Sequence, residues 1–269
     1  MPADIGALCD DLGLETAELV RLLAGLDDAG WSAPTPAAGW SVRDQISHLA
    51  YFDEATTTAV TAPDAFRRSR SEAGADVDAF TARIAERYRG VPADQLLAWF
   101  EGARAEMVVA FRAADPSHRV PWYGPDMSMA SAVTARIMET WAHGQDVADA
   151  GAVPRSPTPA LRQVAHLGVR TLPNSFRTVG RAVPTDPVSV GLVAPSGELW
   201  TWDEGDAADS VRGPALDFCL VVTQRRHIAD TDLVVAGPVA SEWMTIAQAY
   251  AGPPGSGRQP GERRGHATG

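Results

Sequence analysis

Two residue types that bind divalent metals occur four positions apart in the middle of the chain. Glu139 and His143 stand in the segment Glu-Thr-Trp-Ala-His, within an otherwise apolar stretch. On a helix, residues four apart share a face and lie roughly 6 Å apart at Cβ. A carboxylate facing a bundle core is costly unless it is paired or bound to a metal. The pair therefore indicates a metal site, although the same spacing also occurs in ordinary pairs on helix surfaces.

A third candidate ligand, His48, lies in a separate helical segment between Ile46 and Leu49, at the edge of its apolar face. A lone histidine there is usually a buried residue with its own hydrogen bond. Two imidazoles and one carboxylate, however, suit Zn²⁺ and leave an open coordination position. A bound ion lowers the pKa of a bound water or thiol, or polarises a carbonyl.

Helices are needed to position these residues, and the period of the apolar residues predicts them. Ser41, followed by Asp44, predicts a capped helix start. Gly151 predicts a helix end in a left-handed conformation. Residues 61–80 are expected to form a loop with a helical piece. The four main helices are predicted at residues 4–26, 42–60, 92–113 and 128–150. Their lengths predict an antiparallel four-helix bundle.

The second half of the chain has a different pattern. Three prolines in residues 152–159 mark a linker. Beyond them, helices are predicted at 159–170, 215–226 and 239–251, and strands at 188–195, 198–204 and in the segment DLVVAG. We therefore expect an all-α bundle over residues 1–151 and an α+β domain over residues 152–252. Residues 253–269 lack apolar anchors and are expected to be a disordered tail.

Composition excludes several classes of function. The net charge is −11 and all 23 basic residues are arginine, so neither a continuous basic face for nucleic acid nor lysine chemistry is available. Only Cys9 and Cys219 occur, far apart in the sequence, which argues against a disulfide framework. No apolar run approaches the roughly 18–20 residues of a membrane span, and the acidic N-terminus lacks the basic region of a signal peptide. We expect a cytoplasmic monomer.

Two segments resemble the DinB-like superfamily. These are GWSVRDQISHLAYFDE, which is similar to the start of its second helix, and MSMASAVTARIMETWAHGQDVADA, which is similar to its fourth. Together they resemble the metal-binding domain of mycothiol-dependent maleylpyruvate isomerases, and VRGPALDFCLVVTQRR is similar to the C-terminal domain of that family. The resemblance implies a metal, usually zinc, held by His48, Glu139 and His143.

The resemblance also implies an activity. A low-molecular-weight thiol such as mycothiol would add to an activated cis alkene, allow rotation and leave again, which isomerises a small unsaturated keto acid. Transfer of the thiol is the related activity. The residues alone leave two alternatives open, a metal-dependent hydrolase that uses no thiol and a non-enzymatic metal-binding protein.

The remaining candidate residues would assist at such a site. An arginine suits a carboxylate substrate through bidentate pairing. Arg225 is the first candidate for the catalytic arginine, ahead of Arg212 and Arg226, and each of them is otherwise a surface residue. Asp146 is expected either to hydrogen-bond a ligand histidine or to pair with an arginine of another helix.

Overall fold

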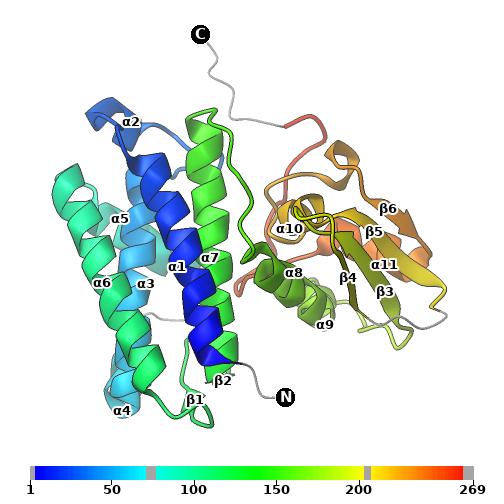
Figure 1. Ribbon diagram of the computed structural model, residues 1–269, viewed down its shortest axis with the longest axis horizontal. Helices are drawn as coiled ribbons and strands as arrows, with labels where there is room; N and C mark the ends of the chain where they lie inside the picture. The colour runs from blue at the N-terminus through cyan, green and yellow to red at the C-terminus, as the bar shows by residue number, and fades with distance from the viewer. Residues whose placement is uncertain (1–3, 71–76, 203–206, 263–269) are drawn as a thin grey trace. The chain divides into compact units, whose positions relative to one another are not determined.

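The computed structural model describes residues 4–70, 77–202 and 207–262 of the 269-residue chain. These residues form two compact units, of which the first runs to Pro154 and the second begins at Arg155. Figure 1 labels the helices and strands of both. Among the described residues, the search for a helix long and apolar enough to cross a membrane found none.

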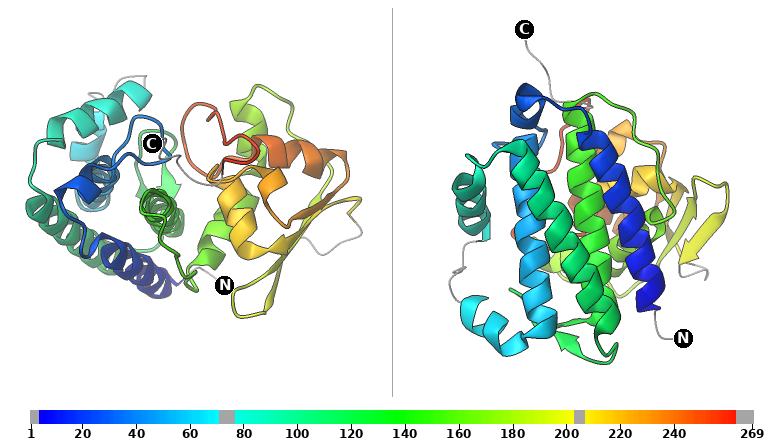
Figure 2. Two further views of the ribbon diagram at one scale, coloured as in Figure 1. Left: turned by 90° about the horizontal axis from the view of Figure 1, so that it is seen from above. Right: turned by 60° about the vertical axis from the view of Figure 1, so that its left-hand side comes forward.

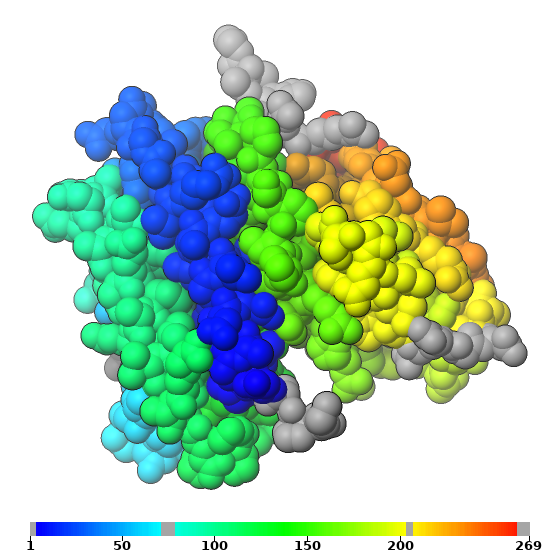
Figure 3. Space-filling view, in the orientation of Figure 1, coloured from blue at the N-terminus to red at the C-terminus, as the bar shows by residue number. Residues whose placement is uncertain are grey.

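The first unit is built from four long helices: α1 (Ile5–Leu23), α3 (Val42–Thr61), α6 (Ala93–Ala113) and α7 (Met129–Ala150). Both α1 and α3 contact α6 and α7, so the four enclose one core, and they lie side by side in Figure 2. In Figure 3 the side chains of α1 and α7 pack along one face. Fully buried side chains fill the interior, among them Leu12, Leu19, Ile46, Leu49, Phe100, Met107 and Trp141. The predicted four-helix bundle is confirmed.

The helix directions differ from the antiparallel arrangement predicted. One core cluster joins the first residues of α3 and α6, such as Val42 and Leu96, to the last residues of α1 and α7, such as Leu22 and Val147. Therefore α3 runs parallel to α6, and α1 runs parallel to α7 (Figure 1). The reason is the long connection between α3 and α6, which returns the chain to the end of the bundle where α3 began.

That connection is also more helical than predicted. It contains α4 (Pro63–Ser69) and α5 (Val77–Tyr88), where a loop with one helical piece was expected for residues 61–80. Proline at the start of α4 suits the first turn of a helix, because proline lacks only an N–H that would be unpaired there. Two shorter features complete the unit: α2 (Asp28–Ser32) and a hairpin of β1 (Arg119–Val120) with β2 (Met127–Ser128).

Local capping sets the register of the two helices that carry the candidate ligands. The Ser41 side chain accepts from the Asp44 N–H and the Asp44 side chain accepts from the Ser41 N–H, which is the predicted capping box of α3. Ser128 caps α7 in a similar way. At the other end of α7, the prediction for Gly151 is wrong: its φ is −80°, and the positive φ of 49° falls on Ala152.

The second unit holds a four-stranded mixed sheet in the order β4-β3-β5-β6. Its strands are β3 (Val188–Val193), β4 (Leu199–Trp202), β5 (Asp209–Pro214) and β6 (Val234–Ala236). β3 pairs with β4 antiparallel and with β5 parallel. The helices are α8 (Leu161–Arg170), α9 (Leu172–Thr178), α10 (Ala215–Val222) and α11 (Pro238–Ile246), with a 3₁₀ turn at Ile228–Asp230. The mixture of helices with a sheet confirms the predicted α+β class.

Two helices of this unit end earlier than predicted. α10 stops at Val222 instead of residue 226, because Gln224 adopts a left-handed conformation with φ of 61°. The N–H of Arg225 then donates to the Leu220 carbonyl, which closes the helix end. The last helix stops at Ile246, where residue 251 was predicted.

Part of the expected tail makes specific contacts. The Gly255 N–H donates to the Gln248 side chain and the Gly261 N–H donates to Asp230. Residues 263–269 of that expected tail lie outside the described residues.

Candidate metal centre

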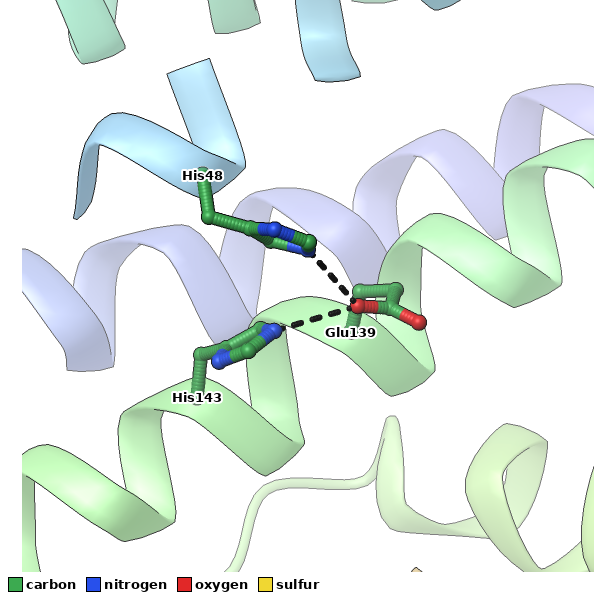
Figure 4. Close-up of side chains that lie close together, drawn as sticks. All are labelled: His48, Glu139 and His143. Atoms are coloured by element: carbon green, nitrogen blue, oxygen red, sulfur yellow. Dashed lines mark hydrogen bonds and ion pairs between the residues drawn. The ribbon is translucent and has the colours of Figure 1, made fainter. Parts of the chain in front are cut away.

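Helix α7 presents two of the predicted ligands one turn apart. The Oε2 atom of Glu139 lies 3.2 Å from Nε2 of His143. Helix α3 supplies His48 from 91 positions earlier, with its Nε2 3.4 Å from the same oxygen. In Figure 4 the three side chains point toward one another, and one carboxylate oxygen faces both imidazoles. The structure thus brings together the three residues that the sequence singled out.

The spacing of these atoms suits a tetrahedral ion. One ligand atom from each residue lies within 4.8 Å of the other two. Zinc bonds of about 2.0–2.1 Å at a tetrahedral angle separate ligand atoms by roughly 3.3 Å. The two distances to Glu139 Oε2, 3.2 and 3.4 Å, lie on either side of that value. The side chains of His48, Glu139 and His143 remain 13, 24 and 11% exposed, which leaves the centre within reach of a small molecule.

The protonation states that this arrangement favours are those that a metal requires. Burial lowers the pKa of His48 to about 4, and the charges of His143 and Arg136 act in the same direction. Burial alone would raise the pKa of Glu139, but the hydrogen bonds and charges of His143 and His48 outweigh it and hold that pKa well below the usual value. A neutral His48 and an ionised Glu139 can both donate electron pairs to a cation.

Aromatic rings enclose the two histidines. The indole of Trp40 is stacked on His143, with ring centroids 5.8 Å apart and planes 9° apart, and meets His48 edge-on at 5.2 Å. The ring of Phe52 lies 4.6 Å from that of His48. Such apolar surroundings exclude water and strengthen electrostatic contacts with a bound ion. In such surroundings the carboxylate of Glu139 needs hydrogen-bonding or charged partners.

The side chain that contacts Nδ1 of His143 is not the one that was expected. The Nδ1 atom of His143 contacts Oε1 of Gln45, which is fully buried in α3. Asp146, predicted as a candidate for this role, has Oδ2 4.0 Å from that nitrogen, too far for a hydrogen bond. The available signal was the position of Gln45, a polar residue one turn before His48 on the same side of the helix.

A second buried polar group, which we call the Asp53 cluster, lies in the same bundle and was also missed. It consists of Asp53, Arg104, Arg136, Thr16 and Thr140. Asp53 accepts from Arg104 at 2.7 Å and from Arg136 at 3.0 Å. Arg104 also donates to the hydroxyls of Thr16 and Thr140, so that all four long helices contribute. Arg136 connects the cluster to the metal centre, because its charge helps to lower the pKa of His48.

The candidate arginines belong to the second unit. Arg212 is exposed on β5, and Arg225 and Arg226 lie half-buried in the turn after α10. The guanidinium of Arg225 donates to the Thr223 carbonyl at 2.7 Å. This contact is local to its own unit, and the catalytic role of Arg225 stays a prediction.

Comparisons with known proteins identify the family of this chain. The model of the family described as mycothiol maleylpyruvate isomerase N-terminal domain matches residues 12–148. Two Mycobacterium tuberculosis proteins, named uncharacterized protein Rv0036c (strain H37Rv) and uncharacterized protein MT0041 (strain CDC 1551), are each 43% identical over 256 residues. The match covers 95% of this chain and 100% of theirs.

Solved structures extend the likeness to the second unit. The crystal structure of the mycothiol-dependent maleylpyruvate isomerase matches with a TM-score of 0.56 and 18% identity, over 83% of this chain and 90% of that one. A histidine-to-alanine variant of the same isomerase matches with a TM-score of 0.55. At this identity the likeness establishes the fold, which is DinB-like in the first unit.

Proposed function

Since this chain belongs to the family of mycothiol maleylpyruvate isomerase N-terminal domains, we propose that it is a divalent-metal-dependent enzyme that acts with a mycothiol-like thiol. Its substrate class is a small unsaturated keto acid, which it isomerises. Zinc is the ion that we propose for the site. The observation that carries this proposal is the convergence of His48, Glu139 and His143, from two helices, on one point inside the bundle.

The donor set supports zinc. Two imidazole nitrogens and one carboxylate oxygen suit that ion, and three protein ligands leave one position open. When bound, the ion would supply a Lewis acid that lowers the pKa of a thiol and makes it nucleophilic near neutral pH.

The protein's own residues have separate tasks in this reaction. Glu139 supplies the negative charge that holds the cation, and Trp40 and Phe52 exclude water from the imidazoles. The thiol first loses its proton, and the thiolate sulfur forms a bond to one carbon of the cis alkene while the alkene electron pair moves to the conjugated carbonyl as an enolate. The former double bond is then a single bond and can rotate. The enolate electron pair re-forms the double bond as the carbon–sulfur bond breaks, and the thiolate leaves unchanged. We propose that Arg225 pairs with the substrate carboxylate.

The test is a sequence of measurements on the purified full chain. Metal analysis is expected to find about one zinc per chain in the wild type and in His118→Ala, an exposed histidine of the same unit. His48→Ala should lose the metal. Calorimetry with mycothiol should then detect binding to the metal-loaded protein, and NMR should detect conversion of a cis-alkene keto acid such as maleylpyruvate to its trans isomer.

The outcomes separate the related functions. Absence of metal from the folded wild type would overturn the proposal. Metal without thiol binding would favour a hydrolase that uses bound water, and thiol binding that yields only a stable thioether would favour a transferase. Arg225→Gln should keep metal and thiol binding and lose turnover, whereas Arg177→Gln, at an exposed arginine of the same unit, serves as its control.

A further inference from the structure

Behind the metal centre, a chain of hydrogen bonds runs from a backbone carbonyl to the imidazole of His143. The Thr35 hydroxyl donates to the Trp40 carbonyl at 2.9 Å. The Gln45 side-chain amide donates to the Thr35 hydroxyl oxygen at 2.8 Å, and Gln45 Oε1 contacts His143 Nδ1. Gln45 is fully buried and Thr35 is 9% exposed, so water competes little for these groups.

The donor and the acceptor of every hydrogen bond in this series follow from the first bond, between Thr35 and Trp40. A carbonyl oxygen can only accept, so the single O–H of Thr35 is directed at Trp40. The Thr35 oxygen then accepts, and the NH₂ of Gln45 is the group that donates to it. This orientation turns the carbonyl oxygen of Gln45 toward His143, where it requires an N–H on Nδ1.

We propose that Gln45 and Thr35 are positioning residues that keep the proton of His143 on Nδ1 and leave the electron pair of Nε2 for the metal. Glu139 acts in the opposite sense in the metal-free protein, because its carboxylate would accept an N–H from Nε2. The buried amide opposes that tautomer. This inference rests on the proposed function, because an Nδ1–H tautomer has a purpose only if Nε2 binds a metal. The tautomer itself is a property of the metal-free chain.

The loop that holds Thr35 is built to keep this geometry. The Thr35 N–H donates to the Trp40 carbonyl at 2.8 Å, and Pro34 pairs with Ser41 as an isolated β-bridge just before α3 begins. Gly39 takes the positive φ of 79° that the turn requires. The same loop places the Trp40 indole on His143. One loop therefore fixes both the ring plane and the protonated nitrogen of this ligand.

The contrast with His48 supports the inference. Nδ1 of His48 is buried and has no hydrogen-bond partner among the described residues. The protein thus provides a buried acceptor at Nδ1 for His143, and among the described residues it provides none for His48. Metal-binding histidines commonly donate their second N–H to an oxygen, and loss of that partner typically costs about 10–100-fold in affinity.

The first test is the tautomer in the metal-free protein. Long-range ¹H–¹⁵N NMR of histidine-labelled chain, recorded well above the ordinary histidine pKa of about 6.5, should show His143 carrying its proton on Nδ1. Gln45→Met, which keeps the length of the side chain but removes the carbonyl acceptor, should move the proton to Nε2. An Nε2–H tautomer in the wild type would overturn the inference, whether or not the protein binds metal.

The second test is zinc affinity, measured by competition with a chelating dye. Gln45→Met should weaken binding by roughly 10–100-fold, and Gln45→Glu should restore it to within a few-fold, because a carboxylate also accepts from Nδ1. Gln248→Met replaces a buried glutamine whose contacts lie in the second unit, and it should leave affinity unchanged. Equal losses in Gln45→Met and Gln45→Glu would reduce Gln45 to a packing residue. Absence of zinc binding in the wild type would instead refute the proposed function.

Discussion

The candidate metal centre and the Asp53 cluster are two polar groups inside one helical bundle, and they differ in how their charges are balanced. In the Asp53 cluster, the carboxylate meets two guanidinium groups, and other arginine N–H groups reach hydroxyls and a backbone carbonyl. Asp53, Arg104 and Arg136 have side chains exposed by 5% or less. At the metal centre, one carboxylate oxygen faces two imidazoles, and the side chains are 11–24% exposed.

The two groups of the same core therefore differ in role: the Asp53 cluster holds helices together, and the candidate metal centre is the site that we propose for function. Buried charges that find all their partners inside the protein hold helices together, and removing one partner leaves an unpaired charge. At the candidate metal centre, two imidazole nitrogens and a carboxylate oxygen face one another, and the proposed cation would join them. The partial exposure of these side chains would give a cation, and a further ligand, a way in.

The largest effect is expected at Asp53. Asp53→Ala leaves Arg104 and Arg136 without their shared carboxylate and should lower the free energy of unfolding by about 3–5 kcal/mol. Urea denaturation in the presence of a chelator measures this change. If Asp53→Ala does not fold, Asp53→Asn should give a smaller loss of the same sign. Asp64→Ala, which removes an exposed partner of Arg67, should change stability by less than about 1 kcal/mol.

At the candidate metal centre, a substitution is expected to lower metal affinity more than it lowers the free energy of unfolding. Glu139→Gln keeps the shape of the side chain and removes the charged ligand. If each ligand carries a similar share of a zinc-site binding energy, the loss is about 3 kcal/mol, on the order of a hundredfold in Kd. Dye competition measures it, with the exposed Glu106→Gln as the control. A metal-free Glu139→Gln that loses as much stability as Asp53→Ala would erase the distinction between the two groups.

The smallest effect is expected at the aromatic wall. Trp40→Leu removes the ring stacked on His143, and such a contact contributes about 0.5–1.5 kcal/mol. Zinc affinity should therefore fall by less than about tenfold, as measured by the same competition. Trp99→Leu is the matched control, since the Trp99 ring packs on Tyr88 instead. A loss at Trp40 as large as that at Glu139 would mean that the indole does more than enclose the ligands.

The sequence predicted the features that depend on local chemistry. The capping box of Ser41 and Asp44 and the apolar period of α7 placed the helices that carry the candidate ligands to within a residue or two. The DinB-like resemblance supplied the pairing of those helices. Burial of Asp53, Arg104 and Arg136 was beyond such patterns, because each charge is satisfied by a partner at least 36 positions away in the chain. β5 was missed for a related reason, since its parallel pairing with β3 is formed only in the folded unit.

The role of Gln45 was hidden in the same way. Its position on the buried side of α3 was visible in the sequence, but its partners Thr35 and His143 come from a loop and from a helix 98 positions later. For Arg225, the sequence predicted a position on a helix, whereas the structure places it in the turn after α10. The helix ends at the left-handed residue Gln224, and glutamine is not a residue type that signals a helix end.

The capping box of α3 also determines where the chain tolerates changes in length. An inserted residue turns everything after it on a helix by about 100°. One extra residue between Ser41 and His48 would therefore carry His48 around the helix and away from Glu139, even if every side chain were kept. A change of length between α3 and α6 would leave the register of His48 and Glu139 unchanged, because α6 starts from its own first turn. Gains and losses of residues should accordingly cost less metal binding in that connection than in the short stretch after Ser41.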